Sequence, residues 1–175
     1  EARARGQTAY AETAPQYLLL DDARYAGEEP WRYILQPPLR PKADCEGLWA
    51  LLSAGAVDMV ITDHCDYTRA QKLEVDDFTQ TPGGLPGLET LLPLMATYGV
   101  AEGQIEWPDL ARLLAANPAR IYGLWPRKGV LRPGADADVV LYDPEPESVL
   151  TDEAVHMRAG YTPFQGMRIQ GKVMT

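Results

Sequence analysis

Two residues that can carry acid–base or metal chemistry, Asp63 and His64, directly follow an apolar run in "MVITDHC", residues 59–65. An apolar run of this kind is typical of a buried strand in a parallel sheet. Catalytic groups of parallel α/β folds lie at the carboxyl ends of such strands. A carboxylate in that place can bind a metal ion or act as a general base toward metal-bound water.

The alternative for this pair is structural, with Asp63 capping the following loop and His64 hydrogen-bonding inside it. Neighbouring side chains of a strand point to opposite faces, which argues against His64 as a direct ligand beside Asp63. A zinc site needs three or four ligands. Cys45, Cys65 and His156 do not complete a convincing set with them. Either the chain binds no metal, or the remaining ligands lie outside these residues.

Strands and helices that alternate along the chain are expected to position Asp63. A strand is expected at 57–62 and a helix before it at 43–55, capped by Asp44. Alternation of this kind predicts an α/β fold with parallel strands. Further expectations are a short strand at 8–12, an extended segment at 31–36, a long loop at 64–86, a helix at 87–99, and within 107–124 a helix followed by a short one that starts near Asn117.

The sequence changes character after Trp125, where turns and a β-type run at 139–142 replace the helical pattern. We therefore expect two parts, an α/β part over residues 1–126 and a β-rich part over residues 127–175. The opening "EARARG" resembles the end of a helix that stops at Gly6 without a start. This indicates that the chain is part of something longer.

Composition narrows the classes of partner. The chain has 175 residues, 46% of them apolar, and a net charge of −9, which argues against nucleic acid and anionic membranes as partners. The longest apolar stretches are too short to span a membrane, and no signal peptide is visible. Two cysteines are too few for a disulfide framework, so we expect reduced thiols in a cytoplasmic protein.

Several segments, taken together and in order, resemble the cyclic amidohydrolases: hydantoinase, dihydropyrimidinase, allantoinase and dihydroorotase. The resemblance covers nearly the whole chain. The segments that carry it are "YAETAPQYL", "QPPLRPKAD", "VITDHCDYTRAQK", "TPGGLPGLETLLPLM", "NPARIYGLWPRKG", "LRPGADADVVLYDP" and "YTPFQG". The "DHC…QK" segment leans toward hydantoinase and dihydropyrimidinase, and "GLPGLETLLPL" leans toward dihydroorotase and allantoinase.

The resemblance implies a fold and a metal centre. The family has a (β/α)8 TIM barrel and a small β-sandwich built from both chain ends, so residues 1–126 would be the last part of the barrel and residues 127–175 part of the sandwich. Its two divalent metals, often zinc, are held by a His-x-His pair, a carboxylated lysine, two more histidines and one aspartate. By the match that aspartate is Asp63, which would bind metal and carry a proton to the leaving amide nitrogen. His64 would support the loop, and the other ligands lie outside this chain.

Two positions that the resemblance assigns to substrate binding depart from the family. Hydantoinases and dihydropyrimidinases place a serine before "PPLR" and an asparagine in the loop after the catalytic strand. The matching residues here are Gln36 and Gly83. Gln36 offers its main chain or its side-chain amide to a ring, whereas Gly83 offers only its backbone. Loss of one side-chain hydrogen bond in a buried site costs about 1–3 kcal/mol, so the substrate is left open.

The function implied is metal-dependent hydrolysis of a C–N bond in a small cyclic amide such as hydantoin or dihydropyrimidine. By itself the chain is expected to be incomplete and inactive, and either to form a homo-oligomer or to associate with the rest of the barrel. One alternative is a non-catalytic dihydropyrimidinase-like scaffold protein, which keeps the fold and loses the metal residues. Another is a dihydroorotase or an allantoinase. Retention of Asp63 favours an enzyme.

Overall fold

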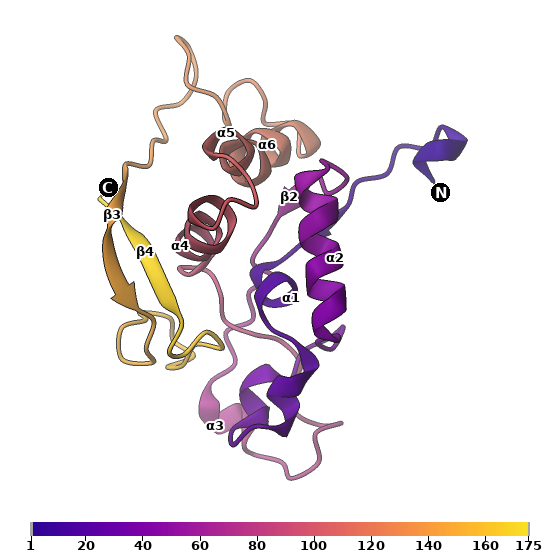
Figure 1. The fold of residues 1–175 in the computed structure, drawn as a ribbon, viewed down its shortest axis with the longest axis vertical. Coiled ribbons are helices and arrows are strands. Elements are labelled where there is room, and N and C mark those ends of the chain that lie inside the picture. The colour runs from indigo at the N-terminus through magenta and orange to yellow at the C-terminus, as the bar shows by residue number, and fades with distance from the viewer. Residues whose placement is uncertain (1, 175) are drawn as a thin grey trace.

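A computed structural model describes residues 2–174 and shows short parallel strands enclosed by helices, with a β-hairpin along one side (Figure 1). Helix α2 lies on the side opposite the hairpin, and α4 lies between them. The helical elements are η1 (Arg3–Arg5), α1 (Pro15–Leu19), η2 (Asp22–Ala26), η3 (Pro30–Tyr33), α2 (Lys42–Ser53), α3 (Arg69–Lys72), α4 (Leu91–Leu94), η4 (Met95–Ala101), α5 (Trp107–Ala111), η5 (Arg112–Ala116) and α6 (Asn117–Ile121). The strands are β1 (Glu12–Thr13), β2 (Met59–Val60), β3 (Tyr142–Val149) and β4 (Arg168–Val173).

The parallel strands are short. Strand β1 pairs with β2, with Thr13 opposite Val60, and a single parallel bridge joins His64 to Leu85 farther along. Parallel pairing was expected, but β2 covers only the centre of the predicted 57–62 strand. Both residues of β2 are buried, which agrees with the apolar run that predicted it.

Three local expectations were wrong. The segment 31–36 is not extended throughout, because Pro30 opens the 3-10 helix η3 with the backbone angle that a first helical turn requires. The loop 64–86 contains a helix, α3, which begins where the Thr68 and Gln71 side chains cap each other's backbone. Asp44 is not the N-cap of α2, because that helix begins earlier, after Pro41.

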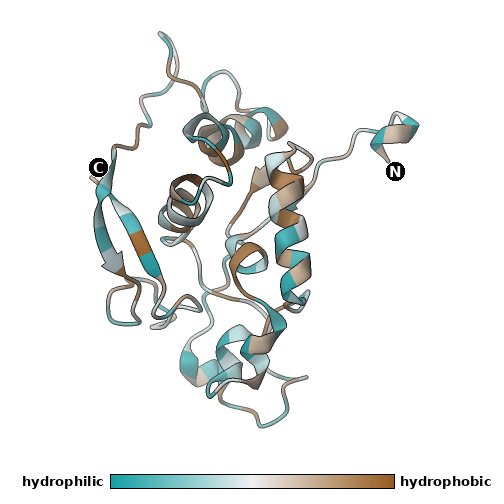
Figure 2. Ribbon diagram, in the orientation of Figure 1, coloured by the Kyte–Doolittle hydropathy of each residue, from teal (hydrophilic) through white to brown (hydrophobic). Residues whose placement is uncertain are grey.

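The core lies between α2, β2 and the helical run from α4 to α6. Leu52, Met95 and Leu113 have no exposed surface there. Figure 2 shows the apolar stretches of α1, β2 and α4 near the centre of the molecule. The two helices expected within 107–124 are observed as one continuous helical run, α5, η5 and α6, which ends at Ile121. No helix in residues 2–174 has the length and apolar character needed to cross a bilayer.

Strands β3 and β4 form an antiparallel hairpin, with an irregularity between Asp143 and Glu147. The hairpin begins later than the run predicted at 139–142. Buried Ile169 joins an apolar cluster with Leu94, and the Gln170 amide donates to Thr97 Oγ1 at 2.9 Å. These contacts hold the hairpin against α4 and η4. The division of the chain into an α/β part over residues 1–126 and a β-rich part over residues 127–175 stays a prediction.

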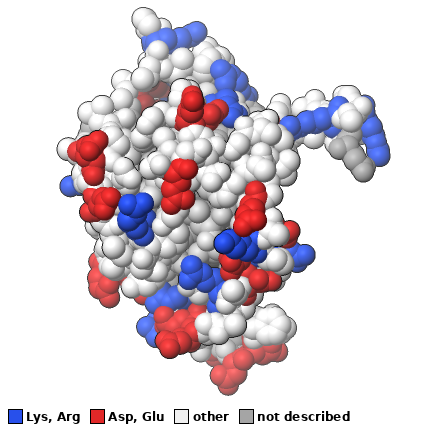
Figure 3. Space-filling view, viewed as in Figure 1, with Lys and Arg blue, Asp and Glu red and all other residues white. Residues whose placement is uncertain are grey.

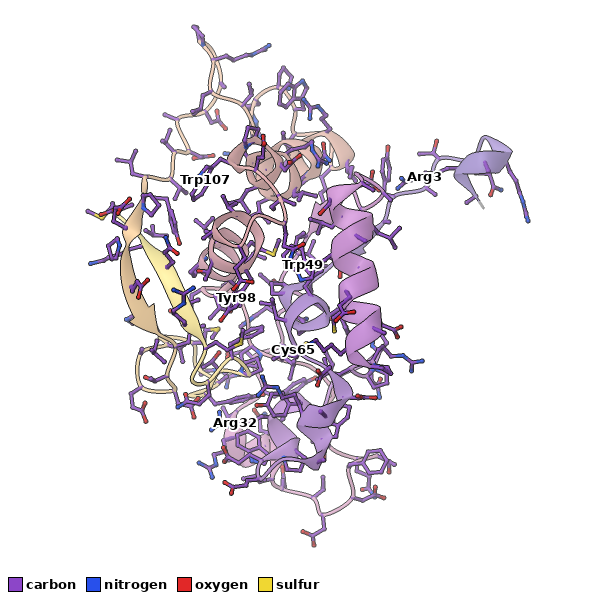
Figure 4. The ribbon with its side chains drawn as sticks, in the orientation of Figure 1. Arg3, Arg32, Trp49, Cys65, Tyr98 and Trp107 are labelled. Carbon is purple, nitrogen blue, oxygen red and sulfur yellow. The ribbon has the colours of Figure 1, made fainter. Side chains whose placement is uncertain are left out.

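Arg32 links η3 to the segment that precedes β4. Its buried guanidinium donates two hydrogen bonds to Asp152, at 2.6 and 2.8 Å, and one to Glu29 at 2.6 Å. It also donates to the Thr162 carbonyl at 3.3 Å and lies 5.0 Å from the centre of the Trp31 ring. Figure 4 shows Arg32 in the part of the molecule that holds η3. Residues 120 positions apart in the sequence are thereby joined.

We predict that Arg32→Met lowers the free energy of unfolding by about 3 kcal/mol, because it leaves the partly buried Asp152 carboxylate without its cation. Burial raises the pKa of Asp152, but the Arg32 hydrogen bond and charge outweigh it, so the pKa lies below its usual value. The stabilisation is therefore complete above a pH of about 4 and is lost as the pH falls through the lowered pKa. Urea unfolding followed by tryptophan fluorescence measures this.

Arg40→Met is the matched control. Arg40 is exposed, and its contact with Asp44 is 3.7 Å long. Its loss is expected to change the free energy of unfolding by less than about 0.5 kcal/mol. Equal effects of the two substitutions would contradict the role assigned to Arg32.

Candidate active site

Asp63 lies three residues beyond the end of β2, with an exposed side chain. Among the non-glycine residues described, it alone has a positive φ, of 47°. Aspartate and asparagine tolerate this left-handed conformation better than other residues with a side chain. The chain thus turns at Asp63 rather than continuing the strand.

The Asp63 side chain lines a cavity of about 340 Å³, a volume suited to a small molecule. The lining comes from β1, α1, the loop after η3, α2 and the end of β2: Glu12, Thr13, Ala14, Tyr17, Pro37, Pro38, Arg40, Leu48, Ile61 and Asp63. Two carboxylates and one guanidinium therefore face an otherwise apolar or hydroxylic wall. Asp63 therefore opens onto a concave surface, although it does not itself end β2, and its catalytic and metal-binding roles stay predictions.

Tyr17 connects this cavity to the loop after η3. Its hydroxyl donates to the Pro37 carbonyl at 3.0 Å. Burial and the negative charge of Asp63 both favour the neutral phenol and raise the pKa of Tyr17 to about 12. Tyr17 is therefore a neutral hydrogen-bond donor that faces Asp63 throughout the physiological range of pH.

The backbone is held on both sides of Asp63. Before it, the buried Gln16 side chain of α1 donates from Nε2 to the Thr62 carbonyl at 3.3 Å. After it, the Gly87 amide donates to His64 Nδ1 at 3.1 Å. The neutral His64 ring that accepts this bond carries its proton on Nε2. His64 thus supports the loop that carries Gly87, as the resemblance implied.

Gln36 and Gly83, 47 positions apart, lie against each other. A Cβ atom on Gly83 would be 3.2 Å from Gln36 Cγ and 3.5 Å from its Cδ. The side-chain amide of Gln36 is exposed and makes no hydrogen bond to a described residue. Pro37 and Pro38, which follow Gln36, line the Asp63 cavity. The structure therefore brings the two substrate-binding candidates together, but Gln36 lines a neighbouring cavity of about 670 Å³ that shares Pro38 with the Asp63 cavity.

The remaining metal-ligand candidates are not assembled. Cys45 is buried and directs its thiol at the Leu20 carbonyl, and exposed His156 contacts Glu89 at 3.0 Å. Within residues 2–174, no three His, Cys, Asp or Glu side chains are grouped so that they can hold a metal ion. Glu12 is the other carboxylate that lines the Asp63 cavity, so a metal at this site requires further ligands from outside residues 2–174.

Sequence reasoning missed two residues of the cavity. Tyr17 and Arg40 were not among the candidate site residues taken from the sequence. Neither carries a local signal, because their proximity to Asp63 arises from the packing of α1 and the proline loop around β2.

The sequence of this chain matches a known protein family and is similar to known enzymes. The model of the amidohydrolase family matches residues 20–174. The chain belongs to the amidohydrolase family. It is 43% identical, over 99% of its length, to the D-phenylhydantoinase of Escherichia coli O1:K1, and covers 38% of that protein. The resemblance expected from the sequence segments is confirmed.

Solved structures of similar proteins share the fold. The dihydropyrimidinase of Brevibacillus agri NCHU1002 superposes with a TM-score of 0.95 at 35% identity, over 99% of this chain and 38% of that one. The D-hydantoinase of Bacillus sp. AR9 superposes with a TM-score of 0.94 at 39% identity, over 98% and 38% of the two chains. The chain therefore has the fold of a part of these amidohydrolases and spans about two-fifths of their length.

We predict that the effect of Gly83→Ala on stability depends on Gln36. Gly83 lies outside the left-handed range of φ, so an added methyl group meets only the Gln36 stem. With Gln36 present, Gly83→Ala is expected to lower the free energy of unfolding by about 0.5–1 kcal/mol. With Gln36→Ala, it is expected to raise it by about 0.4–1 kcal/mol, because alanine restricts the unfolded chain.

Urea unfolding of the four proteins of this double-mutant cycle gives the coupling free energy. Gly84→Ala serves as a contrast, because its Cβ would lie 2.5 Å from Cys65 Sγ whatever residue stands at position 36. Additive effects of Gly83→Ala and Gln36→Ala would contradict the contact.

Proposed function

We propose that this chain is the C-terminal part of a metal-dependent hydrolase that opens small cyclic amides, of the hydantoinase and dihydropyrimidinase type. The observation that carries the proposal is the Asp63 carboxylate, which lies beyond β2 and faces a cavity of about 340 Å³. The relatives named D-phenylhydantoinase and dihydropyrimidinase support this class of substrate. Because the chain covers 38% of each, the activity belongs to a longer enzyme, and the 175 residues alone are expected to be inactive.

The same proposal assigns the two parts of the fold. Residues 1–126 are the last portion of a (β/α)8 barrel, in agreement with the parallel pairing of β1 and β2. Residues 127–175 are part of a β-sandwich, in agreement with the antiparallel hairpin of β3 and β4. Val139, Val140 and Leu141 precede that hairpin and are about half exposed, at 47%, 59% and 56%. Exposed apolar residues beside an open strand edge favour association with the rest of the barrel or with a second copy.

A divalent metal pair, often zinc in the family, is part of the proposal. The described residues fit such a centre in one respect: Asp63 is an exposed carboxylate at the cavity. Glu12 is the other carboxylate in the cavity lining, and within residues 2–174 no three His, Cys, Asp or Glu side chains are grouped to hold a metal ion. The histidines and the carboxylated lysine therefore come from the part of the enzyme outside this chain. When bound, the metals activate water and polarise the ring carbonyl.

Each of the candidate residues of this chain would then have a separate role in the reaction. Asp63 accepts a proton from the attacking water and delivers it to the ring nitrogen as the C–N bond breaks. The carboxamide of Gln36 offers one donor and one acceptor, the complement of a ring amide, and Gly83 offers its backbone. Tyr17, held neutral by burial and by the charge of Asp63, fixes the Pro37 carbonyl at the cavity wall.

Nucleic acid is not a partner in this proposal. On the face drawn in Figure 3, acidic and basic side chains are intermixed, without the continuous basic area that nucleic acid requires. Both cysteines are free thiols, which supports the proposed cytoplasmic location.

The test uses the completed enzyme, defined as the longer parent polypeptide or as a chimera in which this chain replaces the matching stretch of the Escherichia coli D-phenylhydantoinase. We predict that Asp63→Asn lowers kcat for phenylhydantoin or dihydrouracil by about 10²–10⁴-fold, the loss typical of removing a general acid–base group. Asparagine retains the left-handed backbone and the shape of Asp63. Hydrolysis is measured by the loss of ring absorbance.

Asp76→Asn is the matched control, since Asp76 is an exposed carboxylate in the loop after α3, and it is expected to keep kcat within about twofold. A folded completed enzyme that hydrolyses no cyclic amide would support the scaffold alternative. Near-normal turnover by Asp63→Asn would exclude the proposed role of Asp63.

A further inference from the structure

Lys72, the last residue of α3, is a buried cation that the proposed chemistry does not use. Its side chain is 1% exposed, although lysine is almost never fully buried without a partner. Burial lowers its pKa to about 8, against a smaller opposite influence of Cys65. Burial of the Lys72 ammonium group costs folding free energy, so the hydrogen bond that it makes there has to offset this cost.

The contact that Lys72 makes lies at the junction of two loops. Lys72 Nζ donates to the Ile34 carbonyl at 2.6 Å, a short charge-assisted hydrogen bond. The Gly84 amide donates to the same carbonyl at 3.1 Å. One carbonyl oxygen thus joins α3, the segment after η3 and the glycine loop.

These are the two loops that carry the substrate-binding candidates. Ile34 stands two residues before Gln36, and Gly84 directly follows Gly83. The shared Ile34 acceptor therefore lies next to the contact of Gln36 with Gly83. On the other side of the glycine loop, the Cys65 amide donates to the Leu85 carbonyl at 2.9 Å, which ties the loop to the segment that follows Asp63.

The short helix that carries Lys72 is itself fixed. The Thr68 backbone N–H donates to Gln71 Oε1 at 2.9 Å, and the Gln71 N–H donates to Thr68 Oγ1 at 3.3 Å. This reciprocal cap determines the direction in which α3 leaves the loop. The Lys72 side chain is thereby directed inward, toward Ile34.

We propose that Lys72 is a positioning residue that holds the Gln36 loop and the Gly83 loop together as one wall of the substrate site. This inference rests on the proposed function for its link to catalysis, whereas the loop junction is a property of the fold alone. Lys72 touches no reacting atom, so its loss weakens the binding of the ring rather than the proton transfer at Asp63.

The experiment replaces Lys72 with methionine in the completed enzyme, which keeps the length of the side chain and removes its donor. KM for phenylhydantoin is expected to rise about tenfold while kcat stays within about threefold, the signature of lost uniform binding. Lys72→Arg, which keeps a cationic donor, is expected to recover most of the KM. Lys42→Met, at an exposed position of α2, is the control and should leave both constants unchanged.

Hydrogen exchange measured by mass spectrometry provides a readout independent of activity. In Lys72→Met, peptides that cover 33–37 and 83–86 are expected to exchange at least about tenfold faster, while peptides from α2 and α5 are unchanged. Lys72→Gln, whose neutral amide is too short to reach Ile34, takes the place of Lys72→Met if that variant does not fold.

The outcomes separate the two claims. An inactive completed enzyme with the expected local exchange would refute the proposed function and leave the loop junction standing. An active enzyme in which Lys72→Met keeps its KM and its local exchange would refute the positioning role. Faster exchange throughout the chain, or a fall in kcat as large as the rise in KM, would show that Lys72 serves the core in general and would also refute it.

Discussion

The candidate site depends on one constraint: Asp63 has to be exposed at the end of a buried strand while the backbone on either side of it is fixed. The structure meets this constraint with hydrogen bonds from neighbouring segments. Gln16 holds the Thr62 carbonyl, and His64 accepts from the Gly87 amide. The positive φ of Asp63 then turns the carboxylate away from the core. A strained backbone of this kind persists only where its surroundings determine it, and such positions are enriched at active sites.

The rest of the site follows from segments that meet around this turn. Helix α1 supplies both Gln16 and Tyr17, one residue for the strand end and the next for the proline loop. The proline loop brings Gln36 against Gly83, and the Ile34 carbonyl joins it to the glycine loop. The proline loop thus contributes Pro37 and Pro38 to the Asp63 cavity while its neighbouring residues contact the glycine loop, so a substitution in one loop is expected to affect the other.

The sequence was informative where a single segment decides the structure. The apolar run before Asp63 predicted a parallel strand, which is observed as the short β2, and the carboxylate follows three residues beyond its end and lines a cavity. It was misleading where local chemistry outweighed the pattern: Pro30 starts a 3-10 helix in a segment expected to be extended, and the Thr68 cap creates α3 inside an expected loop. Tyr17 and Lys72 were out of reach of sequence reasoning, because each acts on a carbonyl that only the folded chain brings near.

The central claim is that Asp63 stands where this family binds its metal, with the other ligands contributed from outside the chain. Anomalous X-ray diffraction from crystals of the completed enzyme grown with zinc tests it most directly. The account predicts an anomalous peak about 2.0–2.2 Å from an Asp63 carboxylate oxygen, with no other ligand from these 175 residues. Metal peaks that all lie more than about 4 Å from Asp63, or a zinc ion held entirely by residues of this chain, would contradict it.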